Sequence, residues 1–108
     1  MKVSMPSALA TYFAAEDAAD TDVLERCFAT DAVVRDEGRV MQGLDAIKAW
    51  KLAARAKYQY HVTPKRASTV GTTTTVLARV TGSFAGSPVD LTYTFGLANE
   101  RIASLEIH

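Results

Sequence analysis

Apolar positions in the first part of the chain follow the period of an α-helix. Between residues 6 and 19 they recur three to four positions apart, and Pro6 occupies the first turn, where its missing N–H is tolerated. The polar run 20–22 then offers capping side chains for a short second helix, which we expect to end near residues 30–31. The apolar positions are Leu9, Tyr12, Phe13 and Ala19 in the first helix, and Val23, Leu24, Cys27 and Phe28 in the second.

A third helix is predicted over about residues 44–57, directly after Gly43. Its apolar side chains lie at spacings of three and four and form one face for burial. Lys48, Lys51 and Arg55 are expected to lie off this face. The apolar positions are Leu44, Ile47, Trp50 and Ala54.

Strand patterns occupy the remaining segments. The short β-branched run 32–35 reads as a strand, the polar residues 36–39 turn the chain, and Val40 and Met41 are placed to pair back. From about residue 58 the apolar period alternates, and turn signals at 70–71, 86–88 and 98–100 separate four candidate strands. The inward faces of the last two strands are predicted to carry Leu91, Tyr93, Phe95 and Leu97, and then Ala103, Leu105 and Ile107.

This order of elements predicts an α+β domain, in which three N-terminal helices pack against a curved, mostly antiparallel sheet. The length of 108 residues fits one domain over 1–108, and 48% hydrophobic residues suffice for a core. Twelve basic residues balance twelve acidic ones, so we expect neither nucleic-acid binding nor membrane binding. The single Cys27 and the lack of a secretory pattern before the first helix lead us to expect a cytoplasmic protein.

Asp36 is the main candidate for chemistry, because it ends an apolar strand directly before a turn. In a dry cavity its charged form would be disfavoured, which suits a general base. The alternative is a turn carboxylate that accepts backbone N–H bonds. Arg35 and Glu37 flank it and, by strand alternation, should point away. Tyr12, on the first helix, could face the same cavity.

The run Ala-Val-Val-Arg-Asp-Glu-Gly at 32–38, then Gly43 and Ala-Ile-Lys-Ala-Trp at 46–50, resembles the nuclear transport factor 2-like superfamily. The most similar branch holds SnoaL-like polyketide cyclases and ketosteroid-isomerase-like proteins. The resemblance implies a cone-shaped fold with an apolar cavity. It also implies that Tyr12 donates a hydrogen bond to a carbonyl, that Asp36 shuttles a proton, and that Tyr93 stands at the third catalytic position. A homodimer through the outer sheet face is expected as well.

We therefore expect a protein that binds a small, largely apolar, carbonyl-bearing molecule. If it is an enzyme, it would be a cofactor-independent isomerase, cyclase or dehydratase-like lyase. The alternatives are a non-catalytic binding module or a dimeric interaction domain. Candidate ligand-binding residues are Trp50, Phe13, His61, Phe95 and Leu105.

Neither a metal nor a cofactor is expected. His61 and His108 lie far apart in the sequence, without clustered cysteine or carboxylate ligands between them. Strand parity sets His61 opposite to Tyr60 and Val62, so it faces either the cavity or the outer surface. Glycine-rich nucleotide loops and nucleophile elbows are absent from the sequence.

Overall fold

A computed structural model describes residues 4–18 and 21–108, and within them the chain forms the predicted α+β domain. The final position of the predicted first helix, Ala19, lies outside the described residues. The helical elements are α1 (Ser7–Ala18), the 3-10 turn η1 (Thr21–Val23), α2 (Leu24–Cys27) and α3 (Leu44–Tyr58). The strands are β1 (Phe28–Asp36), β2 (Arg39–Gln42), β3 (His61–Val70), β4 (Thr73–Thr81), β5 (Val89–Ala98) and β6 (Arg101–Ile107).

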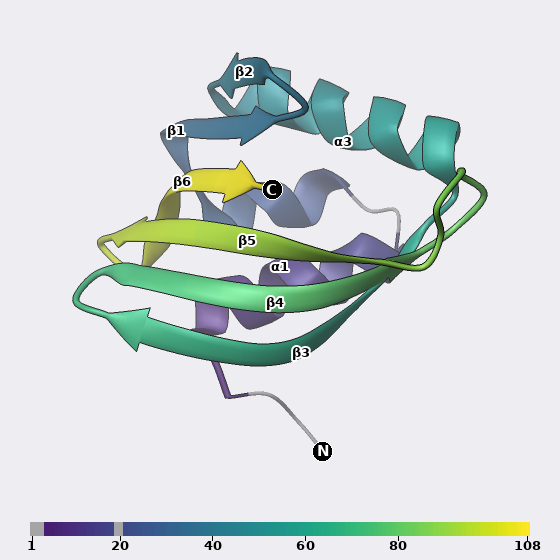
Figure 1. Ribbon diagram of the computed structural model, residues 1–108. Coiled ribbons are helices and arrows are strands. Elements are labelled where there is room, and N and C mark those ends of the chain that lie inside the picture. Colours follow the sequence, from purple (N-terminus) through teal and green to yellow (C-terminus); the bar gives the residue numbers. More distant parts are fainter. Residues whose placement is uncertain (1–3, 19–20) are drawn as a thin grey trace.

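In this described part, the strands form one six-stranded sheet in the order β2-β1-β6-β5-β4-β3. The β1–β6 pair is parallel and the other neighbours are antiparallel, which confirms the mostly antiparallel sheet. The sheet bends, and the helices gather on one side of it (Figure 1). Helix α1 packs against β3 and β6, whereas α3 packs against β1 and β2. The concave face of the sheet is thus covered by two helices that contact different strands.

Strand β1 begins earlier than the apolar pattern predicted. The second helix ends at Cys27, and Phe28 already belongs to β1 and pairs with Ile102 of β6. The prediction of a helix to residues 30–31 was therefore wrong. Four residues of helix gain little by themselves, whereas the aromatic Phe28 and the β-branched Thr30 favour an extended chain beside a partner strand.

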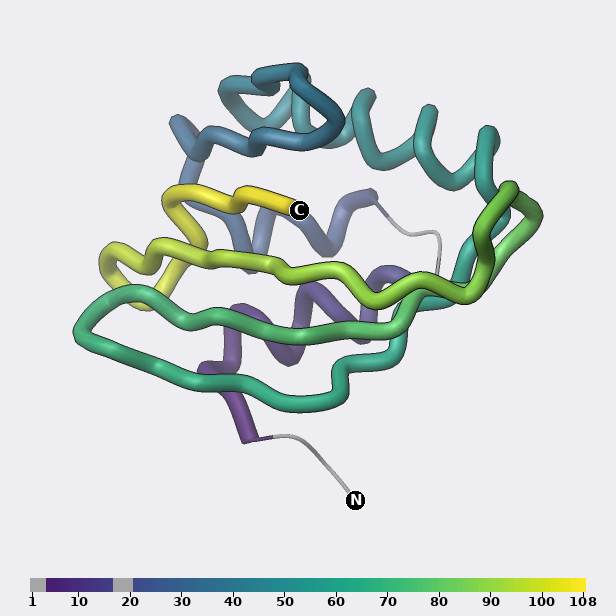
Figure 2. The backbone as a smooth tube through the Cα atoms, viewed as in Figure 1, coloured from purple at the N-terminus to yellow at the C-terminus, as the bar shows by residue number. Residues whose placement is uncertain are grey.

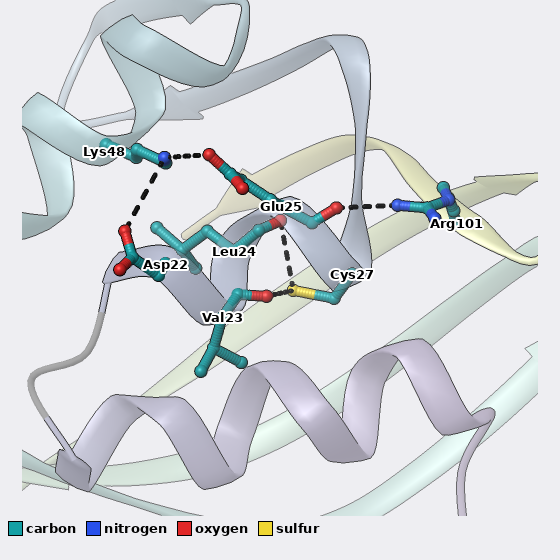
Figure 3. A network of polar contacts seen from close by, with 7 residues as sticks. All are labelled: Asp22, Val23, Leu24, Glu25, Cys27, Lys48 and Arg101. Atoms are coloured by element: carbon teal, nitrogen blue, oxygen red, sulfur yellow. Dashed lines mark hydrogen bonds and ion pairs between the residues drawn. The ribbon is translucent and has the colours of Figure 1, made fainter.

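Polar contacts hold the short η1–α2 segment between α3 and β6 (Figure 3). Lys48 of α3 forms ion pairs with Glu25 and, at 4.0 Å, with Asp22. Arg101 at the start of β6 donates from Nη1 to the carbonyl oxygen of Glu25 at 2.7 Å. Lys48 therefore lies off the apolar face of α3, as predicted, and ties α3 to the preceding segment.

The last strand contains an irregularity that changes which residues face the core. Ser104 pairs with Gly96 but Ile102 pairs with Leu97, so Ala103 is an extra residue in β6. Such a bulge shifts the alternation of side chains by one position. Ile102 and Leu105 are consequently both buried, and Ala103, which we predicted on the inward face with Leu105 and Ile107, is only half-buried.

The core between helices and sheet is dominated by aromatic rings packed edge to face. Tyr12 has Phe13, Phe28 and Phe95 around it at centroid distances of 5.2, 5.7 and 5.5 Å. Such contacts add to the burial of large apolar areas.

Among the described helices, none is long and apolar enough to cross a membrane.

Candidate functional site

A pocket of about 480 Å³ lies between α3 and the strands, which is the size range of small-molecule sites. The β1–β2 turn, α3, the central strands and the connection between β4 and β5 all contribute to its wall. Its lining residues are Asp36, Glu37, Trp50, Lys51, Ala54, Tyr58, Tyr60, Val80, Phe84, Ala85, Gly86, Val89, Leu91, Tyr93 and Ile107. The wall is mainly apolar and aromatic, with a few polar groups.

The backbone of β1 and its turn position Asp36 in this pocket. Ala32 and Val34 are fully buried, and Asp36 follows on the same side of the strand. Asp36 pairs with Arg39 across a two-residue turn, whose residues Glu37 and Gly38 have φ values of 53° and 75°. Positive φ at both central positions is the hairpin geometry that suits twisted strands. The acid is therefore fixed at the last position of the strand.

A hydrogen bond from α3 orients the Asp36 carboxylate. Trp50 Nε1 donates to Asp36 Oδ2 at 3.0 Å. Burial raises the pKa of Asp36 above its ordinary value, the Trp50 hydrogen bond lowers it, and the neighbouring Glu37 raises it. A half-buried carboxylate with a raised pKa can accept a proton from a weakly acidic group more readily than an ordinary aspartate.

Glu37 lies at the rim of the pocket, so the prediction that it points away from Asp36 was wrong. Its positive φ interrupts the strand alternation on which that prediction depended. Tyr58 Oη, at the end of α3, donates to Glu37 Oε1 at 2.8 Å. Arg35, the other neighbour of Asp36, is exposed. The rim therefore joins the β1–β2 turn to the last residue of α3.

Tyr12 lies behind the pocket wall. Its side chain is fully buried, and it is not among the residues that line the pocket. Its hydroxyl oxygen accepts a hydrogen bond from Lys51 Nζ at 2.9 Å. Burial and, second, Glu16 raise the pKa of Tyr12 well above its ordinary value. Asp36 and Tyr12 thus belong to one region of the core, with Lys51 between Tyr12 and the pocket.

Lys51 was not recognised from the sequence as a site residue, and the expectation that it lies off the apolar face was wrong. Its residue is 5% exposed and lines the pocket. Nζ donates to Tyr12 Oη at 2.9 Å and to Tyr60 Oη at 3.1 Å, and it forms an ion pair with Glu16, which is 2% exposed. These three partners match the three donors of an ammonium group.

The positions of Lys51 and Glu16 in the sequence already place both side chains on the apolar faces of their helices. Lys51 lies four positions after Ile47 and three before Ala54, which places it on the same helical face. Glu16 lies four positions after Tyr12 on the other helix. One charge of each sign within two apolar stripes is typical of a buried ion pair.

Two features of the environment of Lys51 shift its pKa in opposite directions. Burial lowers the pKa of Lys51, and the carboxylate of Glu16 opposes this effect. The ammonium also lies 4.2 Å from the ring centroid of Trp50, within the range of a cation–π contact. Lys51 and Asp36 therefore contact opposite parts of the same indole, one its ring face and the other its N–H.

Trp50, a predicted ligand-binding residue, and Tyr93, a predicted catalytic residue, line the pocket, whereas the other predicted ligand-binding residues do not. Burial raises the pKa of Tyr93, and none of the hydrogen bonds found among the described residues involves its hydroxyl. His61 is exposed on β3, with Tyr60 and Val62 buried on the opposite side, so parity places it on the outer face. The remaining predicted residues, Phe13, Phe95 and Leu105, are buried in the core.

The connection between β4 and β5 lies beside the end of α3 (Figure 2), and Phe84, Ala85 and Gly86 of this connection line the pocket. Ser83 N donates to the carbonyl oxygen of Tyr58 at 2.9 Å. A Cβ atom at Gly82 would lie 2.8 Å from that same oxygen, so only glycine fits here without displacement. The ring of Phe84 packs edge-on to Tyr58 at 5.8 Å and completes this wall.

Within the described residues, no group of three or more His, Cys, Asp or Glu side chains could hold a metal ion.

Comparison with known proteins is consistent with this architecture. The sequence model described as the SnoaL-like domain matches residues 9–105. No protein among those with curated descriptions matches the chain. The similarity of this chain to known proteins is therefore shown by the model of the SnoaL-like domain and by solved structures.

Two solved structures share both fold and sequence with this chain. One is a Sinorhizobium meliloti protein provisionally described as a polyketide cyclase, with 44% identity, a TM-score of 0.94, and coverage of 96% of this chain and 95% of that one. The second is a Catenulispora acidiphila protein with a ketosteroid isomerase-like fold, solved with trimethylamine. It has 25% identity, a TM-score of 0.85, and coverage of 97% and 86%. A Cytophaga hutchinsonii NTF2-like protein has the same fold at 8% identity, with a TM-score of 0.80 and coverage of 100% and 91%.

Proposed function

Because this chain belongs to the SnoaL-like domain family, we propose that it binds a small, largely apolar, carbonyl-bearing molecule and transfers a proton on it without a cofactor. The observation that carries the proposal is the carboxylate of Asp36, which lines a mainly apolar pocket and is oriented by Trp50 at 3.0 Å. The similarity to a protein provisionally described as a polyketide cyclase agrees with chemistry at a carbonyl compound.

Asp36 acts as the general base in this proposal. Its carboxylate takes a proton from the carbon next to the ligand carbonyl, and the electron pair of that C–H bond moves to give an enolate. Returning the proton to a different carbon isomerises the ligand. Attack of the enolate carbon on a second carbonyl instead closes a ring, the π pair of that carbonyl moves to its oxygen, and the protonated Asp36 gives its proton to the resulting alkoxide. The raised pKa of Asp36 supports both the uptake and the return of the proton.

Tyr93 is the group that would donate to the ligand oxygen in the pocket. Its side chain lines the wall, and burial raises the pKa of its phenol, which keeps the proton on it at neutral pH. A donor aimed at a developing oxyanion in a dry site is worth about 3 kcal/mol. Tyr12, to which the family resemblance assigns this role, is fully buried and would act through Lys51.

The test compares the wild type with Asp36→Asn on small cyclic ketones and enones. Exchange of the α-hydrogens in heavy water and isomerisation of the double bond both report on proton abstraction. We expect Asp36→Asn to slow both by about a hundredfold or more. Asp90→Asn is the matched control, because this exposed acid pairs with Arg79 at the surface and does not line the pocket.

Equal rates for the wild type and Asp36→Asn would remove Asp36 from the mechanism. A thermal-shift measurement with the same compounds separates the alternatives. Stabilisation by ligand that persists in Asp36→Asn, without measurable exchange in the wild type, would identify a non-catalytic binding module. An absence of both stabilisation and exchange would favour an interaction domain.

A further inference from the structure

Among the described residues that line the pocket, Lys51 is the only one with a primary amine. Its side chain is 6% exposed, so this amine is shielded from bulk solvent although it belongs to the pocket wall. A lysine that is desolvated in an apolar pocket can attack a carbonyl carbon and form an imine. The pocket therefore combines a mainly apolar wall with a group that can bond covalently to a carbonyl compound.

The surroundings of Lys51 favour the neutral form of this amine. Burial has the largest effect and lowers the pKa of Lys51, and the guanidinium of Arg55 lowers it as well. The carboxylates of Glu16 and Asp36 raise this pKa. The net direction is downward, so the fraction of neutral, nucleophilic amine at neutral pH exceeds that of an ordinary lysine.

Lys48, three positions earlier on α3, lies in a different environment. It forms ion pairs with Glu25 and Asp22, and its hydrogen bond to Glu25 raises its pKa. It does not line the pocket. The two lysines of one helix therefore differ in burial, in the direction of their pKa shifts and in access to the pocket, and Lys48 serves as an internal reference for the reactivity of Lys51.

The partners of Lys51 Nζ also suit the cation that a protonated imine carries. Glu16 forms an ion pair with Nζ, and the ring centroid of Trp50 lies 4.2 Å from it. A protonated imine keeps one N–H and one positive charge on this nitrogen, so the Glu16 carboxylate and the indole face can stabilise it as they stabilise the ammonium. The Tyr60 hydroxyl also interacts with Glu16 and Arg55, so it keeps polar partners when Nζ no longer donates to it.

We propose that Lys51 forms a protonated imine with aldehydes and unhindered ketones that enter the pocket, with Glu16 as its counter-ion. This inference goes beyond the proton transfer by Asp36 and rests on the proposed function only for the carbonyl group of the ligand. It narrows the ligand class, because esters, amides and carboxylic acids do not form imines with lysine in water.

Imine formation replaces the carbon–oxygen double bond of the ligand with a carbon–nitrogen double bond. The Lys51 ammonium first gives one proton to water. The nitrogen lone pair then attacks the carbonyl carbon, and the π electron pair of the carbonyl moves to its oxygen. A second proton moves from the nitrogen to this oxygen, which takes up a further proton from the solvent and leaves as water with the electron pair of the C–O bond. The remaining lone pair of the nitrogen forms the second C–N bond, and the nitrogen retains one proton and one positive charge.

Reductive trapping of the folded protein detects this bond. The probe is benzaldehyde, and sodium cyanoborohydride delivers a hydride to the carbon of the protonated imine, which leaves a stable benzyl group on the nitrogen. We expect mass spectrometry of the intact wild type to show one added benzyl group, and peptide mapping to locate it on Lys51. Lys51 should be modified faster than Lys48 by about tenfold or more, since each unit of difference in pKa changes the fraction of neutral amine about tenfold.

Two variants and a competitor serve as controls. Lys51→Arg keeps a cation beside Glu16 but cannot form an imine, so it should lose the benzyl group. Lys48→Arg should be labelled like the wild type. Benzyl alcohol has a similar shape but no carbonyl group, and it should slow the labelling of Lys51 by occupying the pocket. A thermal melt of each variant verifies folding, and the peptide map of the wild type locates the modified lysine without any variant.

Labelling of Lys51 no faster than that of Lys48 would overturn the proposal, and so would an unlabelled wild type. The bond to Lys51 requires no proton abstraction from carbon, so Asp36→Asn should still be labelled on Lys51. Loss of α-hydrogen exchange in that variant, with labelling intact, concerns the role of Asp36 alone. Normal exchange in an unlabelled wild type would refute the imine alone, so failure of one proposal can be told apart from failure of the other.

Discussion

Replacing Trp50 with phenylalanine isolates the hydrogen bond that orients the proposed base. The variant keeps an aromatic ring in the pocket wall and beneath the Lys51 ammonium, but it loses the Nε1 donor that lies 3.0 Å from Asp36 Oδ2. That hydrogen bond favours the charged carboxylate and lowers the pKa of Asp36 against the effect of burial. Without it, the pKa of Asp36 should rise further.

The size of the rise follows from the strength of such a bond. Hydrogen bonds to charged groups contribute about 1.5–3 kcal/mol. Asp36 is only half-buried, and solvent screening reduces the effect. We therefore expect an increase of about one pKa unit, which corresponds to about 1.4 kcal/mol.

Two measurements check this prediction. The carboxyl carbon of Asp36, followed by NMR as pH is varied, should titrate at higher pH in Trp50→Phe than in the wild type. Asp36→Asn identifies the signal, because the corresponding resonance disappears. The acidic limb of the proton-transfer rate should move to higher pH by the same amount. An unchanged or lower titration midpoint would refute the role assigned to Trp50.

Three further outcomes are expected. The folded-state pKa of Asp36 is raised, so the native state binds more protons and stability falls as pH rises from 3.8 through the folded value. The free energy of unfolding of Asp36→Asn, measured in urea, should lack this decrease with pH. The same pH dependence in the variant and the wild type would contradict a raised pKa of Asp36. Phe95 is buried in the core and does not line the pocket, so Phe95→Ala should lower the free energy of unfolding in urea by about 3–5 kcal/mol. Leu91 lines the pocket, so Leu91→Ala should lower the free energy of unfolding by less and should weaken ligand binding. A larger loss of stability in Leu91→Ala than in Phe95→Ala would contradict the assignment of Phe95 to the core and Leu91 to the pocket wall. Cys27, fully buried with its pKa raised to about 11 by burial, should resist alkylation at neutral pH until the protein unfolds.

The local patterns of the sequence were sufficient for most of the elements. Alternation and turn residues predicted the strands of the second half, and helical spacing predicted α1 and α3 within about one residue at each end. The start of β1 depended on pairing between Phe28 and Ile102, which are far apart in the chain. The face of Ile102 depended on a bulge at Ala103. Neither long-range pairing nor a bulge is encoded in local periodicity.

The residues of the candidate site could be predicted only where their position follows from the local pattern of their own helix or strand. Asp36, Trp50 and Tyr93 line the pocket because each follows the regular alternation or spacing of its own element. Lys51 was expected to lie off the apolar face of its helix, and its burial could not be predicted because it depends on a partner, Glu16, on a different helix. The homodimer proposed from the family resemblance stays a prediction.

The two connections at the mouth of the pocket, β1–β2 and β4–β5, differ from each other in how freely they can vary. The acid is tied to a strand end and to α3, while Phe84, Ala85 and Gly86 belong to a surface connection that carries no strand pairing. Insertions or exchanges in that connection would alter which molecules enter without moving the carboxylate. Descendants of this scaffold can therefore acquire new selectivity through a few surface positions, while Asp36 stays in place.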